Sequence, residues 1–261
     1  MGRVMGGPQA AALVLPSAGP DPIPLATALA AVLGYARGRR PLFFRSPSSP
    51  QGRWVQVLAY AMDRFDGQPA ETADGPTDRD VLLAEGLHGR LDPAAWSAVR
   101  ARLVSAWPLV ELALERAGGR AFWELPDDDF SVLAEPGTVG AALRSLAEGP
   151  DARHVVAALH HRHPALVPLL DGVTRRQLWG HLREGDSGPE SVVHRELVAN
   201  AEAFGVLETA AATLLGRSLT RLRLHDVLLW LSGSLRMTHA VAVGRALAAD
   251  SEQGLEALLP A

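Results

Sequence analysis

Two residue types are missing from this chain of 261 residues, and each absence excludes a class of chemistry. There is no cysteine, which excludes disulfide bonds, thiolate metal ligands and cysteine nucleophiles. There is also no lysine, so all 25 strongly basic residues are arginine and a lysine Schiff-base mechanism is closed. A GC-rich coding sequence accounts for both absences and for the excess of Ala, Gly, Pro and Arg.

Net positive charge and long apolar runs are also lacking. The formal net charge is −4, which argues against nucleic-acid binding over the whole surface but permits a local basic patch. No apolar run reaches the roughly 20 residues that span a bilayer, and the N-terminal residues lack the apolar core of a signal peptide. We therefore expect a cytoplasmic protein with no membrane partner.

Strand signals are scarce, and helical apolar spacing dominates, so the predicted fold is mainly α. Residues 1–22, rich in Gly, Pro and Ala, are predicted to form a loose N-terminal arm. Residues 23–261 are predicted to form a single all-α globular unit, in which two helical subdomains would divide near the polar loop 66–76. Helices are expected over residues 24–37 and 54–65, among others.

Two local patterns predict helix starts. Thr77 is followed three residues later by Asp80, the arrangement in which a side chain caps the helix and an acidic residue favours its N-terminal dipole. Asp92 followed by Pro93 combines a capping residue with a proline in the first turn. Helices are therefore expected to begin directly after Thr77 and after Asp92.

Basic and aromatic residues are interleaved near residue 40: Arg37, Arg39, Arg40 and Arg45 bracket Phe43 and Phe44. Arginines beside aromatic rings are typical of surfaces that stack nucleic-acid bases. The commoner explanation is a loop whose phenylalanines fill the core, and this is the interpretation that we favour from the sequence.

Residues 146–171 form the stretch around which the rest is organised. A helix end is followed by the tight turn Gly149-Pro150-Asp151, by a helix rich in Arg and His, and by an extended apolar run that stops at Asp171. The start of the second helix could bind phosphate through its backbone N–H groups, with added charge from Arg153. Asp151 could instead cap that helix and repel a phosphate, and the residue types alone favour this alternative.

This stretch resembles the helix-hairpin-helix DNA glycosylases, whose hairpin has a Gly-hydrophobic-Gly core and is followed by an essential Asp. Gly149-Pro150-Asp151 stands at the hairpin, and Asp171 stands at the distance expected for the essential Asp. The resemblance implies a helix-hairpin-helix unit at 138–171. Two departures matter: Asp151 replaces the second glycine, and Arg153 stands where lyase-type members carry a Schiff-base lysine.

The chain resembles more closely an uncharacterised actinobacterial domain-of-unknown-function family related to those glycosylases, over about residues 65 to 235. The motif residues are Leu159, His160, His161, Arg162, His163, Pro164, Leu166, Val167, Pro168, Leu169, Leu170 and Asp171, then Arg175 and Arg176, and later Asp226 and Trp230. His163 and Leu170 depart from the family, which has Arg and Tyr there. This resemblance implies an α-helical, glycosylase-like fold without an established activity.

The glycosylase resemblance implies that Asp171 is catalytic, stabilising positive charge on a sugar or activating water. A monofunctional enzyme of this kind needs no lysine. The residues expected to bind nucleic acid or substrate are Gly149, Arg153, His160, Arg162, His163, Arg175 and Arg176. The alternative is that Asp171 caps the helix that begins at Gly172, and the two roles are compatible.

No metal or cofactor is predicted. The histidines at 154, 160, 161 and 163 lie close in sequence, but no spacing such as HExxH is present. His225, Asp226 and Trp230 lie on an apolar helix, where we interpret them as core residues with interhelical hydrogen bonds.

Four functions stay open. The first is a monofunctional N-glycosidic bond hydrolase acting on DNA, another nucleic acid or a nucleoside-like small molecule. The others are a non-catalytic nucleic-acid-binding module, a glycosylase-like scaffold repurposed for small-molecule biosynthesis, and a protein-interaction subunit. Basic residues around the turn would favour nucleic acid, whereas a closed pocket at Asp171 would favour a small molecule.

Overall fold

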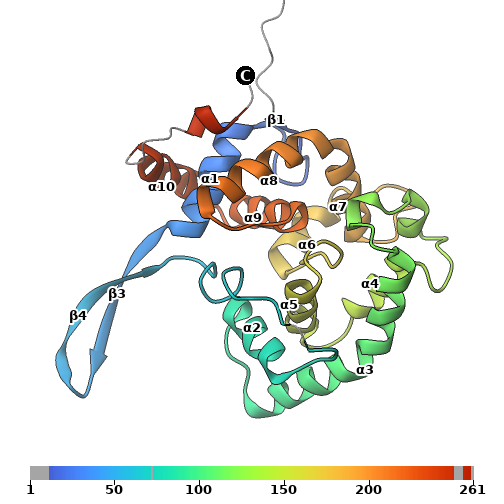
Figure 1. The fold of residues 1–261 in the computed structure, drawn as a ribbon, viewed down its shortest axis with the longest axis horizontal. Coiled ribbons are helices and arrows are strands. Elements are labelled where there is room, and N and C mark those ends of the chain that lie inside the picture. The colour runs from blue at the N-terminus through green and yellow to red at the C-terminus, as the bar shows by residue number, and fades with distance from the viewer. Residues whose placement is uncertain (1–11, 72, 250–254, 260–261) are drawn as a thin grey trace, which may run out of the picture.

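The computed structural model of the chain describes residues 12–71, 73–249 and 255–259, and these form ten α-helices, three short 3-10 helices and two two-stranded sheets (Figure 1). The α-helices are α1 (Leu25–Arg37), α2 (Asp78–His88), α3 (Pro93–Ala117), α4 (Val139–Leu146), α5 (Ala152–Arg162), α6 (Gly172–Trp179), α7 (Pro189–Ala199), α8 (Ala201–Leu215), α9 (Arg221–Gly233) and α10 (Met237–Ala249). The 3-10 helices are η1 (Phe122–Glu124), η2 (Asp127–Phe130) and η3 (Leu255–Leu258). The mainly α fold is thus confirmed.

The strands pair as β1 (Ala12–Leu13) with β2 (Ile23–Pro24) and β3 (Arg39–Ser46) with β4 (Ser49–Leu58), both antiparallel. Both predicted helix starts are confirmed. Asp80 accepts a hydrogen bond from the Thr77 backbone N–H at 2.6 Å at the start of α2. Asp92 accepts from the Ala95 N–H at 2.8 Å at the start of α3.

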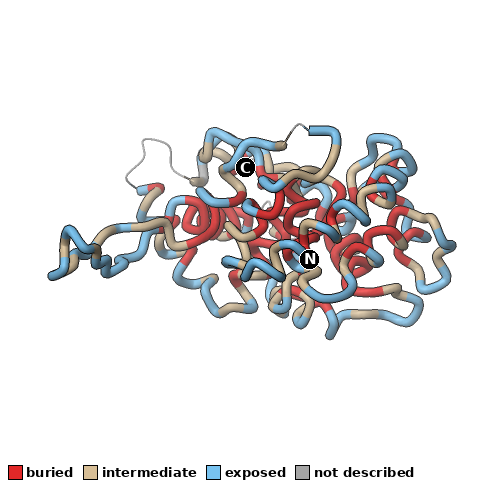
Figure 2. Tube along the Cα trace, turned by 90° about the horizontal axis from the view of Figure 1, so that it is seen from below, coloured by how far each residue is buried: buried red, intermediate tan, exposed pale blue. Residues whose placement is uncertain are grey.

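Helix α1 is the most deeply buried element and lies against α8, α9 and α10 (Figures 1 and 2). Two glycines allow α1 and α10 to cross closely, because a Cβ on Gly34 would collide with the backbone oxygen of Ala240, and one on Gly244 with that of Ala30. No larger residue fits at either position without separating the helices. The crossing therefore fixes the position of α1, which carries Tyr35 next to Gly34.

The N-terminal segment is packed rather than loose where the structure describes it. Leu13 and Leu15 are buried in the core, and the Val14 N–H donates to Asn200 Oδ1 at 2.7 Å. The prediction of a loose arm is therefore wrong for residues 12–22, because two leucines among small residues suffice to anchor the segment. Residues 1–11 of the predicted arm lie outside the described residues.

The largest correction concerns residues 39–58. The predicted helix over 54–65 is wrong, since β4 extends to Leu58 and the following residues form turns; the fold is accordingly not all-α. Strands β3 and β4 form a ribbon that projects away from the helices (Figure 1). Phe43 and Phe44 are 42% and 46% exposed, so they do not fill the core.

The segment 146–171 contains a turn between two helices. Gly149 (φ 84°) and Asp151 (φ 53°) both adopt left-handed backbone conformations between α4 and α5. The Asp151 side chain makes no capping hydrogen bond, so its predicted capping role is wrong. Beyond α5, irregular chain leads to Asp171 at the start of α6. The division into two subdomains near 66–76 stays a prediction.

Within the part of the chain that the structure describes, no single helix has the length and apolar composition to cross a membrane. The pair α9 and α10 satisfies those criteria only when joined across a bend of 119°.

A buried ion pair joins α5 to α2. The Arg162 guanidinium donates to both oxygens of Asp80, at 2.7 and 2.8 Å, and to the carbonyls of Ala73 and Gly75, both at 2.7 Å. The side chains of Arg162 and Asp80 are only 5% and 1% exposed. All of these bonds lie within the protein, so Arg162 holds the 73–80 segment and is not placed to bind a ligand.

We predict that Arg162→Met lowers the free energy of unfolding by about 3–5 kcal/mol, because it leaves a buried carboxylate without its cation. Arg100→Met is the matched control: Arg100 pairs with the exposed Asp78, and its loss should change stability by at most about 1 kcal/mol. Urea unfolding followed by circular dichroism measures both. Equal, small losses would show that Arg162 is not structural.

Candidate functional site

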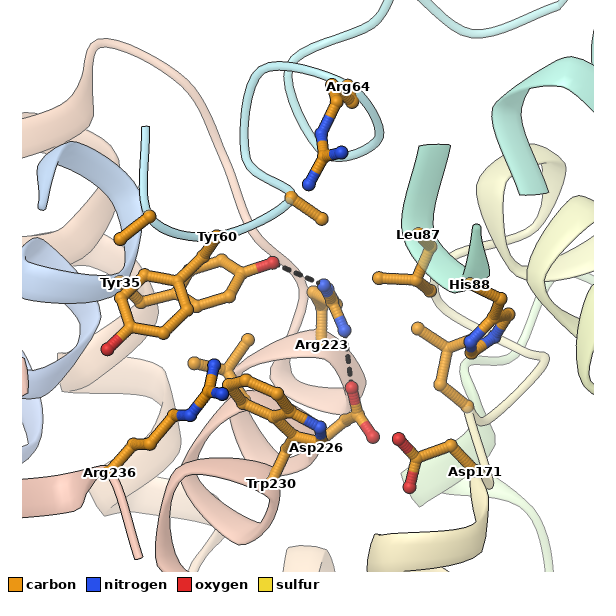
Figure 3. A pocket seen from close by; sticks show the side chains of 14 residues that line it. Tyr35, Tyr60, Arg64, Leu87, His88, Asp171, Arg223, Asp226, Trp230 and Arg236 are labelled. Atoms are coloured by element: carbon orange, nitrogen blue, oxygen red, sulfur yellow. Dashed lines mark hydrogen bonds and ion pairs between the residues drawn. The ribbon is translucent and has the colours of Figure 1, made fainter. Parts of the chain in front are cut away.

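A pocket of about 200 Å³ opens between α1, the turns after β4, α2, the start of α6 and α9 (Figure 3). Asp171, the predicted catalytic residue, lines it. The other lining residues are Tyr35, Ala59, Tyr60, Ala61, Arg64, Leu87, His88, Leu169, Arg223, Asp226, Val227, Trp230 and Arg236. The pocket therefore brings residues from the first and last thirds of the sequence together around Asp171.

A buried arginine forms the base of the pocket. The Arg223 side chain is 5% exposed and makes a bidentate ion pair with Asp66, with Nη2 2.9 Å from Oδ2. It also donates to the Tyr35 hydroxyl at 2.7 Å and to Asp226 Oδ2. The Tyr35 hydroxyl in turn donates to Asp66 at 2.7 Å. One cation thus serves two carboxylates, and the group as a whole carries excess negative charge.

That imbalance affects the protonation of Asp226. Burial raises the pKa of Asp226 to about 7; Arg223 opposes this shift, and the charges of Asp171 and Asp66 add to it. Arg223 is shared with Asp66 and cannot neutralise both acids, so the pKa of Asp226 stays raised. Asp226 can therefore hold a proton at neutral pH, which an exposed aspartate does not.

Asp171 caps a helix and also lines the pocket, while its catalytic role stays a prediction. Its Oδ1 accepts hydrogen bonds from the backbone N–H groups of Val173 and Thr174 at 2.7 and 2.8 Å, so it caps α6 as expected. The carboxylate also points into the pocket toward Asp226 (Figure 3). Among the described residues we find no hydrogen-bond donor to its Oδ2 oxygen, which leaves that atom available to a ligand.

Aromatic rings line the side of the pocket nearest α1. Tyr35 stacks on Tyr60 with ring centroids 5.3 Å apart, and the edge of Tyr60 meets Trp230 at 5.8 Å. The guanidinium of Arg236 lies 5.2 Å from the Trp230 ring centre, and Arg64 stands exposed near the opening. A flat ring could stack here with an anionic group beside the arginines.

His88 lines the opposite side of the pocket (Figure 3). Burial, with the neighbouring His154, lowers the pKa of His88 to about 4, and the two rings meet at 5.4 Å. His88 is consequently neutral at neutral pH and can donate or accept a hydrogen bond without adding charge.

None of the predicted binding residues lines the pocket that holds Asp171. Gly149, Arg153 and Arg175 line a shallow depression near the α4–α5 turn. This depression also includes Asp151 and the two chain neighbours of Asp171, Leu170 and Gly172. Arg175 donates to the Ala147 carbonyl at 3.3 Å, so part of its hydrogen-bonding capacity is used by the end of α4. The depression combines two cations with one carboxylate, so its net positive charge is smaller than that of two free arginines.

The remaining predicted binding residues do not reach the pocket. His160 is buried, and its Nδ1 lies 2.6 Å from the Val167 carbonyl oxygen. His163 is partly buried, with its ring 6.1 Å from that of Trp107. Arg176 is exposed and lines neither hollow. His160 therefore has a structural contact, and the binding role predicted for it is not supported by its buried position.

The residues on α9 were interpreted from the sequence as core, and burial confirms this for Asp226 and His225. The His225 Nε2 bonds Glu196 at 2.7 Å in the interior. What the sequence interpretation missed is that Asp226 and Trp230 also line the pocket together with Arg223. Their spacing of three and then four residues places all three side chains on one helix face, and this regularity was the available signal.

The described residues contain no group of three or more His, Asp or Glu side chains that could hold a metal ion. Comparisons of the chain with protein-family models, with curated proteins and with solved structures found no match. The fold and the pocket thus define a mainly helical protein with two facing carboxylates, one of which readily holds a proton.

We predict that the stability of the protein depends on pH through Asp226. Between about pH 4 and 7 the folded protein keeps this proton while the unfolded chain, with an aspartate pKa of about 3.9, releases it. The folded state binds more protons, so the contribution of Asp226 to the free energy of unfolding falls as pH rises through this window.

The Asp226→Asn side chain cannot ionise, so this variant should lack the decline in the free energy of unfolding that the wild type shows as pH rises. Its stability relative to the wild type should therefore rise by about 2–3 kcal/mol between about pH 5 and pH 8, as measured by urea unfolding. Asp74→Asn, at an exposed position, is the control and should show no such change. A difference that stays constant with pH would contradict the raised pKa.

Proposed function

We propose that the protein is a monofunctional hydrolase of an N-glycosidic bond in a nucleic acid or a nucleoside, acting through the pocket at Asp171. One observation carries the proposal: two carboxylates, Asp171 and Asp226, face a single pocket, and the pKa of Asp226 is raised to about 7. Glycoside hydrolysis needs such a pair, one group to donate a proton and one to act as carboxylate.

The proposed reaction assigns a separate role to each acid. Asp226 donates its proton to a ring nitrogen of the base as the bond between that base and the sugar breaks. Asp171 stabilises the positive charge on the sugar and takes a proton from the water that attacks the anomeric carbon. The products are the free base and the sugar with a new hydroxyl group. No lysine takes part, so no covalent Schiff-base intermediate forms.

The lining of the pocket suits this class of substrate. Tyr60 and Trp230 supply aromatic surface to contact a base, and Arg64 and Arg236 offer cations for a phosphate near the opening. The volume of about 200 Å³ lies below the roughly 300–1,000 Å³ of sites for drug-sized ligands. A single nucleoside unit therefore fits better than a longer segment.

The order of elements is compatible with the resemblance to helix-hairpin-helix glycosylases. A glycine-containing turn joins α4 to α5, and an aspartate follows at the start of α6. We propose that the fold is related to those enzymes, with the α4–α5 turn in place of their hairpin. The depression at that turn stands as a secondary nucleic-acid contact, since Asp151 offsets only one of the two charges of Arg153 and Arg175.

A second candidate is a small-molecule site in a repurposed scaffold. It is favoured by the confined pocket and by the position of Asp171 inside it, away from the predicted basic residues. In this case a free anionic aromatic compound would occupy the space between Trp230 and the two carboxylates. The hydrolase and the small-molecule alternative differ in whether a base is released.

We predict that Asp171→Asn retains the fold, because Asn caps a helix about as well as Asp, but loses activity by orders of magnitude. Asp226→Asn should lower the rate about 10²–10⁴-fold, since it cannot donate a proton. The assay is release of free base, by chromatography, from nucleosides, nucleotides and single-stranded oligonucleotides.

The pH profile adds an independent test, because wild-type activity should fall above about pH 7 as Asp226 loses its proton. Arg245→Ala, at an exposed position of α10 outside the pocket, is the control and should match the wild type. Asp171→Ala should additionally lower stability by about 0.5–2 kcal/mol through loss of the cap.

If no substrate releases a base, and a bound aromatic compound is recovered unchanged, the small-molecule alternative replaces the hydrolase.

A further inference from the structure

The β3–β4 ribbon is a second surface with a composition unlike that of the rest of the chain. Residues 39–58 include Arg39, Arg40, Arg45 and Arg53 and no acidic residue, in a protein of net charge −4. In the described part of the chain, β3 and β4 pair only with each other, and both strands are largely exposed (Figures 1 and 2). The ribbon therefore presents concentrated positive charge away from the body.

One face of the ribbon combines aromatic rings with this charge. Phe43 is the cross-strand partner of Trp54, so the two side chains share a face, and their ring centroids lie 5.2 Å apart. The Arg45 guanidinium lies 5.3 Å from the Phe43 ring centre, and Arg39 shares the face by strand alternation. Phe43 and Trp54 are 42% and 69% exposed.

This exposure requires an explanation, because the rings stabilise no core. Gly52 stands next to the Phe43 ring and the Arg45 side chain, and a Cβ there would collide with the ring. The glycine thus leaves room for the Phe43 ring beside the backbone of β4. The result is a pair of exposed rings, tilted by 57° to each other, with cations beside them. Exposed aromatic rings next to cations are what bind bases and their phosphates.

We propose that the Phe43–Trp54 face of the ribbon binds single-stranded nucleic acid. Bases stack on Trp54 and Phe43, and phosphates lie against Arg39 and Arg45. The inference goes beyond the proposed hydrolase activity and does not depend on it, because binding to the ribbon requires neither Asp171 nor Asp226.

The charge and pattern of the ribbon favour nucleic acid over two other occupants. A second copy pairing edge to edge would bring eight arginines together without an acidic partner, which is unfavourable. A membrane surface is met by elements with one apolar and one charged face. Here the opposite face also carries arginine, since Phe44 is the partner of Arg53, so neither face is free of charge.

The test is fluorescence anisotropy with a labelled single-stranded DNA of about 16 nucleotides, a length within the range of known binding sites. We expect the wild type to bind, and Trp54→Ala and Phe43→Ala each to weaken binding at least about 5-fold, through loss of base stacking. Arg39→Ala and Arg45→Ala should each lower the slope of log affinity against log salt by about 0.7.

Matched controls lie elsewhere on the surface. Trp179→Ala removes a tryptophan that is 62% exposed at the end of α6, and Arg245→Ala removes an exposed arginine of α10. Both should bind as the wild type does. Circular dichroism should show that the ribbon variants remain folded, because none of the four substituted side chains is buried.

Three results would overturn the inference: no binding by the wild type, equal binding by wild type and Trp54→Ala, or equal loss in ribbon and control variants. Capture of the wild type, but not of Trp54→Ala, by phosphatidylserine vesicles without DNA binding would assign the ribbon to membranes instead. Asp171→Asn should bind DNA normally. DNA binding without base release from any nucleoside, nucleotide or oligonucleotide would therefore refute the hydrolase while leaving this inference intact.

Discussion

The buried charge of Arg223 is the constraint on which the rest of the structure depends. Its partners come from three segments far apart in sequence: Tyr35 on α1, Asp66 in the turns after β4, and Asp226 one turn further along α9. A guanidinium taken out of water is tolerated only when such partners are all in place. The pocket therefore forms only when α1, α9 and the connecting turns have assembled.

The same interaction determines what the pocket can do. Arg223 is shared between Asp66 and Asp226, and the Asp171 carboxylate lies nearby, so Arg223 alone does not balance the charge of these three acids. Holding a proton on Asp226 is the least costly way to relieve this imbalance. Acid–base capacity thus follows from the way in which the fold neutralises a buried arginine. Replacing Arg223 would alter the pocket and the helix packing together.

Local sequence signals predicted those features that depend on neighbouring residues. The Thr77 and Asp92 helix starts and the cap at Asp171 were predictable because each cap acts within three residues of its own helix. The presence of Asp171 in a pocket was expected only from the family resemblance. Nothing in the sequence indicated that Tyr35 would join it, because its contact with Arg223 spans most of the chain.

The errors have a common physical origin. Arg162 belongs to a basic motif that suggested ligand binding, yet its charge is consumed by Asp80, a partner that no local pattern identifies. Residues 37–45 were predicted as a loop whose Phe43 and Phe44 fill the core, because aromatic residues are usually buried, yet both rings are exposed. Sequence gives the hydrophobicity of a side chain, whereas the contacts available to it are decided by the remainder of the fold.

The ribbon and the pocket are joined through the backbone, which relates the two proposals in space. The Ala59 N–H donates to the Gly38 carbonyl at 2.8 Å where the ribbon meets α1, and the residues from Ala59 to Ala61 then line the pocket. A strand of nucleic acid held on the ribbon would be repelled by the net negative charge of the protein. It would meet positive charge again at Arg64 and Arg236, beside the opening. Under both proposals, these two arginines favour a path for the nucleic acid along the ribbon toward α1. There Tyr60 and Trp230 line the pocket that would take one unstacked nucleobase.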